Sequence, residues 1–201
     1  MSQIGNLGHS AILLPASLVL FCVLLWLGRR ADALAFLAAL SVCLVAALVA
    51  KLFFHACGSG DVALGIESPS GHVSFSAVFY GCLALLFSAA RPLWQRIVIG
   101  AGAALFVVLI GASRVVVWAH TVPDVAAGLV IGAASLLVFQ ALRGPPRPLV
   151  APFGAIAFGA PAAAILVVVI LHFARHWTPE PLIEVVALRL GLLLDACAPL
   201  S

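Results

Sequence analysis

The sequence has very little charge. Only 8% of its 201 residues are Asp, Glu, Lys or Arg, whereas 65% are hydrophobic and the mean hydropathy is +1.26. Soluble domains carry about 25% charged and about 45–50% apolar residues. A chain with so few polar side chains cannot cover a water-exposed surface with them, so the composition predicts a polytopic membrane protein. The net charge of +3 is too small to indicate a nucleic-acid partner.

Several sequence signals are missing as well. No two of the five cysteines form a CxxC pair, which argues against a thiolate metal site or a redox motif. The first ten residues carry no Lys or Arg, so we expect the first apolar run to be an anchor rather than a signal peptide. There is no internal repeat and no low-complexity linker, and we therefore expect residues 1–201 to form a single domain.

Long apolar runs are what the sequence has in abundance. A spanning helix needs roughly 20 mostly apolar residues. Six runs qualify, and they predict an all-α, polytopic membrane helix bundle with about six transmembrane helices: 11–27, 32–50, 72–90, 97–113, 124–142 and 153–174. The weaker stretch near 182–195 contains charges, so we expect residues 181–201 to hold an interfacial segment rather than another span.

The arginines predict the orientation. Three alternate connections contain them in pairs: Arg29 and Arg30, Arg91 and Arg96, Arg143 and Arg147. Short loops rich in Lys and Arg remain in the cytoplasm. We therefore expect a protein integral to a bacterial cytoplasmic membrane, with the second and fourth connections on its outer, periplasmic face.

The stretch "SPSGH", residues 68–72, stands directly before the third span. Ser68 suits an N-cap and Pro69 suits the first helical position, so we expect the helix to begin there. The amides of Ser70, Gly71 and His72 would then be unpaired, and such a helix N-terminus binds anions. The simpler alternative is a plain helix cap with an incidental histidine.

The stretch "SRVVVWAHTVPDVAAG", residues 113–128, joins the fourth and fifth spans. Pro123 suits a first turn, so the fifth span is expected to start near Val122 and to place Asp124 at the positive end of the helix dipole. Here the simpler alternative is that Asp124 only complements the dipole, while Arg114 is an anchor that reaches the interface.

The two stretches are expected to meet. The third and fourth spans form a hairpin, so His72, Arg114, His120 and Asp124 emerge at one membrane face, where the second span also ends with Lys51. Cations and open amides bind a phosphate, and a histidine beside a carboxylate is an oriented nucleophile. This set predicts phosphoryl transfer through a phosphohistidine. A zinc site built from His55, His72, His120 and Asp124 is the rival, disfavoured because Lys51 and Arg114 would repel a dication.

These motifs resemble a known family. Lys51, "PSGH" at 69–72 and "SR-x5-H-x3-D" at 113–124 are similar to the three signature motifs of the type 2 phosphatidic acid phosphatase superfamily. The resemblance implies the following roles. His120 is the nucleophile, Asp124 orients it, and His72 is the general acid for the leaving group. Lys51, Ser70, Gly71 and Arg114 bind the phosphate, and no metal or organic cofactor takes part.

The first motif departs from the family pattern. The family has Arg-Pro where this chain has Gly58 and Ser59, so one phosphate-binding guanidinium is missing. The resemblance implies a phosphatase acting on a lipid phosphate or diphosphate among membrane lipids, with undecaprenyl diphosphate or phosphatidate-type lipids as leading substrates. Two alternatives remain: a lipid phosphotransferase, or a non-catalytic lipid-binding or transport protein on the same scaffold.

Overall fold

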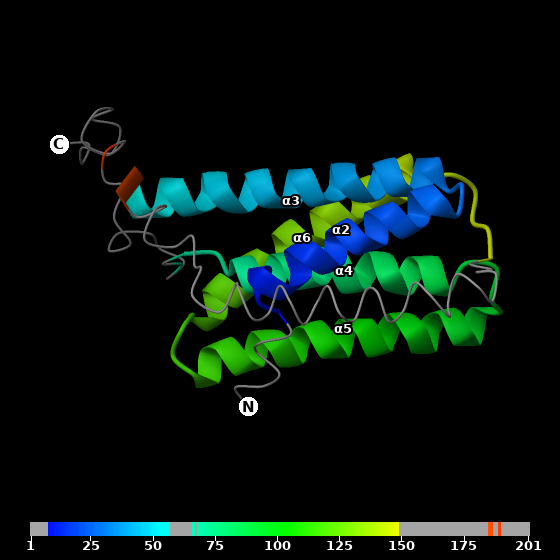
Figure 1. Ribbon diagram of the computed structural model, residues 1–201. Helices are drawn as coiled ribbons and strands as arrows, with labels where there is room; N and C mark the ends of the chain where they lie inside the picture. Colours follow the sequence, from blue (N-terminus) through cyan, green and yellow to red (C-terminus); the bar gives the residue numbers. More distant parts are fainter. Residues whose placement is uncertain (1–7, 57–65, 67, 149–184, 187–188, 190–201) are drawn as a thin grey trace.

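A computed structural model describes residues 8–56, 66, 68–148, 185–186 and 189, and in these residues the secondary structure is entirely helical. Five helices follow one another along the chain (Figure 1): α2 (Ser10–Trp26), α3 (Arg30–Ala56), α4 (Gly71–Phe87), α5 (Leu93–Val116) and α6 (Val122–Leu142). They confirm that the first five predicted runs are helical, with most ends within a few residues of the predicted ones, and three of the helices, α3, α5 and α6, are long and apolar enough to cross a membrane. The sixth predicted span, the C-terminal segment and positions 58 and 59 lie outside the described residues.

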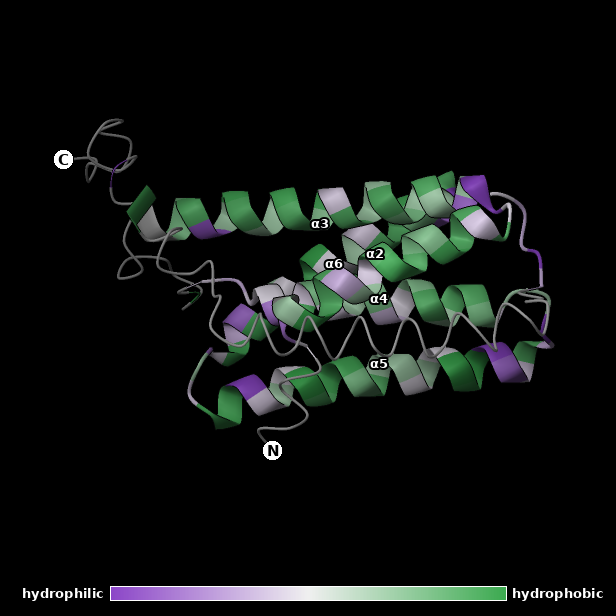
Figure 2. Ribbon diagram, viewed as in Figure 1, coloured by the Kyte–Doolittle hydropathy of each residue, from purple (hydrophilic) through white to green (hydrophobic). Residues whose placement is uncertain are grey.

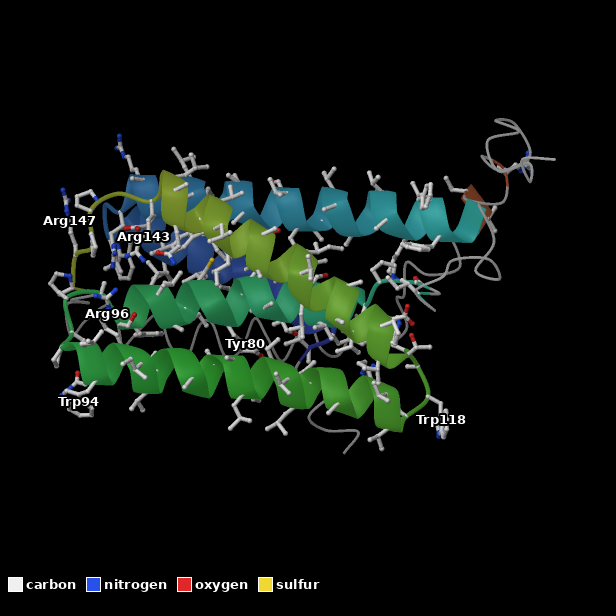
Figure 3. All side chains as sticks on the ribbon, turned by 180° about the vertical axis from the view of Figure 1, so that it is seen from behind. Tyr80, Trp94, Arg96, Trp118, Arg143 and Arg147 are labelled. Carbon is white, nitrogen blue, oxygen red and sulfur yellow. The ribbon has the colours of Figure 1, made fainter. Side chains whose placement is uncertain are left out.

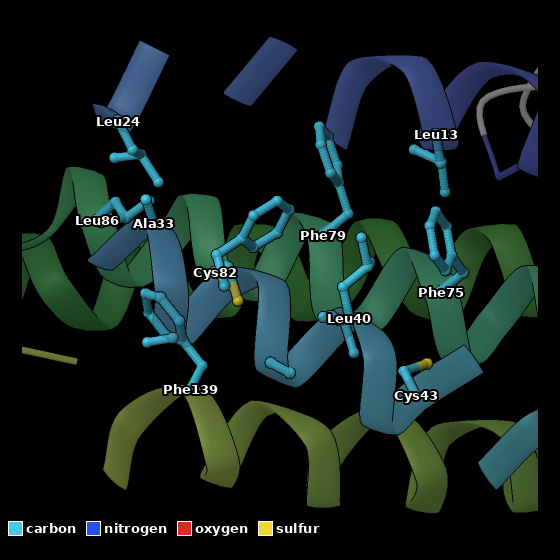
Figure 4. Packing of buried hydrophobic residues seen from close by; sticks show 14 residues of the cluster. Leu13, Leu24, Ala33, Leu40, Cys43, Phe75, Phe79, Cys82, Leu86 and Phe139 are labelled. Atoms are coloured by element: carbon cyan, nitrogen blue, oxygen red, sulfur yellow. The ribbon is translucent and has the colours of Figure 1, made fainter. Parts of the chain in front are cut away.

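Helix α4 is the centre of the bundle. It contacts each of the other four helices, with α2, α3 and α6 around one side and α5 on the other (Figure 1). The buried cluster in Figure 4 fills the space between α2, α3, α4 and α6, and its largest fully buried side chains include Phe36, Phe139 and Leu86. Helices α5 and α6 contact each other only slightly, since both pack against α4.

Two glycines allow α6 to approach α4 closely. A Cβ atom built at Gly128 would lie 2.6 Å from the carbonyl oxygen of Ser70, and one at Gly132 would lie 2.9 Å from that of Ser74. These distances leave no room for a side chain, so the GxxxG spacing of Gly128 and Gly132 allows a close backbone contact between the two helices. The contact fixes the beginning of α4 against the beginning of α6.

The outer surface of the bundle suits a membrane. Helices α3, α5 and α6 are long and apolar enough to cross one, with mean hydropathies of 2.7, 2.1 and 2.2. Hydrophilic residues gather near the helix ends (Figure 2). Trp94 and Trp118 are exposed at opposite ends of α5 (Figure 3), as expected for side chains at the two membrane–water interfaces.

Candidate active site

Asp124 is fixed by the turn that begins α6. Thr121 is the N-cap, and its Oγ1 accepts a hydrogen bond from the Asp124 amide at 3.2 Å. In return, Oδ2 of Asp124 accepts one from the Thr121 amide at 2.9 Å. This reciprocal capping box satisfies two amides that a helix N-terminus leaves open. Pro123 lies in the first turn, so the predicted start of the helix near Val122 and the place of Asp124 in its first turn are both confirmed.

Asp124 also holds the segment before α4. Its Oδ1 accepts a hydrogen bond from the Ser68 amide at 2.9 Å, and its backbone carbonyl accepts one from the Ser70 amide at 3.1 Å. Only 1% of the residue is exposed. A single buried aspartate therefore clamps the two sequence motifs together, although they are far apart along the chain.

This clamp overturns one prediction about the start of α4. The helix begins at Gly71, with Ser70 rather than Ser68 as its N-cap, because residues 68–70 are bound to α6. The sequence suggested an open amide at Ser70, but this amide donates a hydrogen bond to the backbone carbonyl of Asp124. The amides of Gly71 and His72 lie in the first turn of α4, where a helix supplies no acceptor. Ser70 contributes a buried hydroxyl whose oxygen has no hydrogen-bond partner in the described part of the chain.

His120 lies in the connection between α5 and α6. The amide of Ala119 donates to the carbonyl of Arg114, and that of Trp118 donates to the carbonyl of Val115, both at 3.0 Å. This is the Schellman arrangement that ends many helices, in which the residue of positive φ is usually glycine. Here Trp118 takes that place with φ 58°. The turn leads directly to His120, whose Nδ1 lies 3.6 Å from Oδ2 of Asp124.

His72 is in the first turn of α4, and its Nε2 is buried without a hydrogen-bond partner among the described residues. Its ring packs edge-on against that of His9, with the ring centroids 5.0 Å apart. His9 caps α2, because its Nδ1 accepts a hydrogen bond from the Ala11 amide at 3.3 Å. No motif in the sequence marks His9. Its place could still be expected from the arginine pattern, which puts the start of the first span on the same face as the start of the third.

Two basic side chains complete the cluster. Lys51 is buried in α3, and its Cε lies 3.7 Å from the position that a Cβ would take at Gly71. Arg114 is in the last turn of α5, with a buried Nε that has no hydrogen-bond partner among the residues described. Four basic groups lie close enough to His72 for their charges to act on it: Arg114, His9, His120 and Lys51. The end of the bundle therefore combines buried positive charge with a carboxylate that is already occupied by backbone amides.

The rival zinc site lacks a complete set of ligands in the described structure. Within that part of the chain, no three His, Cys, Asp or Glu side chains converge as a metal site requires. The side chain of His55 lies outside the described residues. Because Asp124 already accepts hydrogen bonds from Ser68 and Thr121, its carboxylate is better suited to orienting His120 than to ligating a metal.

Comparison with known proteins identifies the family. A model of the PAP2 superfamily matches residues 53–145, a stretch that contains His72, Arg114, His120 and Asp124. The chain belongs to the PAP2 superfamily. Its membership supports a phosphatase-type activity and, together with the long apolar helices, indicates a membrane protein.

The match extends beyond the signature region in one relative. A protein of Klebsiella pneumoniae, described as an uncharacterized 22.5 kDa protein in the cps region, is 30% identical over 192 residues, which cover 94% of this PAP2 chain and 90% of the relative. No solved structure matches this chain. The PAP2 match begins two residues after Lys51, so the match does not include this residue. The assignment of Lys51 to the site depends instead on its position beside Gly71.

Proposed function

We propose that this chain is a lipid phosphatase of the cytoplasmic membrane, which hydrolyses a lipid phosphate or diphosphate through a phosphohistidine on His120. The observation that supports it best is the pairing of His120 with Asp124. Two backbone amides fix the carboxylate in place, so it presents Oδ2 to the imidazole in a constant position. A carboxylate in that position favours the tautomer that carries the proton on Nδ1, which leaves the lone pair of Nε2 available for attack.

In the first step, Nε2 of His120 attacks the terminal phosphorus and the bond to the leaving oxygen breaks. His72 donates a proton to that oxygen, which departs as an alcohol or as a lipid monophosphate. In the second step, water attacks the phosphohistidine while His72 accepts its proton, and inorganic phosphate is released. General acid–base groups of this kind contribute about 10²–10⁴-fold to a rate.

The phosphate oxygens need donors that the buried cluster supplies. Lys51 and Arg114 provide charge, and charge-assisted hydrogen bonds are about twice as strong as neutral ones. The amide of Gly71 and the hydroxyl of Ser70 add neutral donors beside them. This cationic environment supports a metal-independent reaction, since Lys51 and Arg114 would repel a dication.

A substrate with an apolar anchor suits a site at the end of an apolar bundle. The arginine distribution supports an outer-face position for this end, and undecaprenyl diphosphate and phosphatidate-type lipids are the leading candidate substrates there. The chain would form a single catalytic domain in a bacterial membrane. These assignments rest on composition, topology and family membership.

The test is phosphate release by the purified full-length protein from a panel of lipid monophosphates and diphosphates. We expect release without added metal, no loss of activity in EDTA, and inhibition by vanadate, which adopts the five-coordinate geometry of the reacting phosphorus. Activity that is lost in EDTA and restored by zinc would favour the rival metal site. Product that appears only when a second alcohol is present would indicate a phosphotransferase, and no turnover of any lipid would favour a binding protein.

A further inference from the structure

The end of the bundle opposite His120 contains a polar pocket. Its volume is about 360 Å³, and it lies where α4 ends, α5 begins and α6 leads into the following loop. Polar side chains of Ser88, Arg96, Gln140 and Arg143 line it. Figure 3 shows Arg96, Arg143 and Arg147 gathered at this end, with Trp118 at the far end of the molecule.

The side chain of Arg143 is buried in this pocket, and some of its hydrogen-bond donors are unpaired among the described residues. Its side chain is only 8% exposed, its Nη1 donates to the carbonyl of Leu85 at 3.4 Å, and its Nε lies 3.8 Å from Oδ1 of Asp32. Nη2 has no partner among the described residues. A buried guanidinium with an open donor is costly unless something else satisfies it.

The neighbouring carboxylate cannot satisfy it fully. Asp32 is shared with Arg29, whose Nε lies 2.8 Å from Oδ2. Both terminal nitrogens of Arg29 are also buried without a partner in the part of the chain that the structure describes. Two guanidinium groups and one carboxylate leave one positive charge in excess, so this end of the bundle attracts an anion.

An apolar groove adjoins the polar pocket. It has a volume of about 420 Å³, lies between α4, α5 and α6, and shares Leu85, Ser88 and Arg96 with the pocket. Small residues such as Gly81, Gly100 and Gly132 line it, and it exists because α5 and α6 diverge. A cationic pocket continuous with an apolar groove is complementary to a phospholipid: the pocket suits the phosphate and the groove suits an acyl chain.

We propose that this pocket and groove bind an anionic phospholipid as a resident ligand, at the end of the bundle opposite the catalytic cluster. Arg96 and Arg143 hold the headgroup phosphate, and one acyl chain lies along the glycines of α4 and α5. The site is separate from the one occupied by substrate. A phosphodiester lipid without a terminal phosphate suits it, because such a lipid is not a substrate for the reaction at His120.

The test uses the purified full chain in neutral detergent, with phosphatidylglycerol as the probe and phosphatidylcholine and inorganic phosphate for comparison. The readouts are the midpoint of thermal unfolding and the number of lipids retained in native mass spectrometry. Phosphatidylglycerol should raise the midpoint of the wild type, and phosphatidylcholine should not. Arg96→Gln should require about tenfold more phosphatidylglycerol for the same shift, since one charge-assisted contact is lost.

Matched variants in α5 test the groove. A Cβ at Gly100 or at Gly102 would meet nothing within 4 Å, but only Gly100 lines the groove. Gly100→Leu should abolish the lipid shift, whereas Gly102→Leu and the exposed-arginine control Arg147→Gln should behave as wild type. The proposal is overturned if phosphatidylcholine stabilises equally, or if Arg96→Gln and Gly100→Leu both respond as wild type. It is also overturned if inorganic phosphate alone reproduces the shift and Gly100→Leu leaves it unchanged, which would indicate a free-anion site.

Discussion

Among the described residues, each end of the bundle buries one aspartate, and the two aspartates have different partners. Asp124 is held by the backbone amides of Ser68 and Thr121 and faces His120. Asp32 lies between the guanidinium groups of Arg29 and Arg143. Arginine stays charged at any physiological pH, so Asp32 can only be a fixed counter-ion. Histidine changes its protonation near neutral pH, so Asp124 can take part in proton and phosphoryl transfer.

The turns after α2 and α5 differ in a second way, although positive φ at a residue with a side chain is not confined to the His120 end, because Ala90 between α4 and α5 also has φ 61°. Helix α2 and helix α5 both end in a Schellman arrangement. Gly28 supplies the positive φ after α2, at 70°, whereas Trp118 supplies it after α5, at 58°. A left-handed conformation costs a residue with a side chain about 1–2 kcal/mol. The connection that carries His120 therefore bears backbone strain, as functional segments often do, and the connection that carries Arg29 does not.

Among the substitutions that compare the two ends, Asp124→Asn has the largest expected effect. The amide nearly preserves the shape of the side chain but removes the charge that orients His120, and a similar change in other enzymes lowers turnover by about 10⁴-fold. We expect a fall of at least about 10³-fold in kcat for phosphate release, measured at a temperature where the variant remains folded. A variant that retained most of its turnover would remove Asp124 from the mechanism.

The same substitution at the other end should affect stability instead. Asp32→Asn leaves two buried guanidinium groups without a counter-charge, and breaking a buried ion pair costs about 3–5 kcal/mol. The variant should unfold at a markedly lower temperature while its kcat, measured well below that temperature, stays within a few-fold of wild type. If Asp32→Asn abolished turnover without loss of stability, the two ends would not be functionally distinct.

Gly128→Ala tests the contact that joins the two motifs. The new Cβ would lie 2.6 Å from the carbonyl oxygen of Ser70, which must shift to accommodate it. Overpacking of this kind costs about 1–3 kcal/mol. The shift also displaces the start of α4, so turnover should fall by about tenfold or more. Gly102→Ala is the control, because a Cβ there meets nothing within 4 Å. Equal behaviour of the two variants would contradict a positioning role for this contact.

The smallest effect is expected at His9. It packs against His72, the proposed general acid, and takes no direct part in the proposed reaction. Aromatic pairs contribute about 0.5–1.5 kcal/mol beyond the area they bury. His9→Ala should therefore slow turnover by up to about tenfold through misplacement of His72, and His9→Phe, which keeps an aromatic ring, should recover most of the rate. If His9→Phe were as slow as His9→Ala, the imidazole itself would be required.

Local sequence signals predicted much of this structure. The apolar runs predicted the first five helices, and Pro123 with Asp124 predicted the start of α6, because both features act within one turn of helix. The hairpin geometry predicted that His72 and Asp124 lie at one end. The start of α4 was misplaced because Ser68 and Ser70 bind Asp124, a residue more than fifty positions away.

Side-chain partners were harder to predict than the helices. Nothing in the local pattern indicates that His9 packs on His72, since the contact depends on how α2 packs against α4. The ion pair between Arg143 and Asp32 also joins distant segments, and loop arginines are equally expected to meet lipid headgroups. The arginines predicted an orientation, but their positions did not reveal that Arg29 and Arg143 are buried.

The most direct test of the account is to trap the phosphorylated enzyme. The purified protein is mixed with a lipid substrate labelled in its terminal phosphate, and the reaction is stopped in alkaline detergent, which preserves phosphohistidine. We predict that wild-type protein carries the label on His120, that acid treatment releases it, and that His120→Ala carries none and releases no phosphate. Label on another residue, or undiminished phosphate release by His120→Ala, would contradict the proposed mechanism.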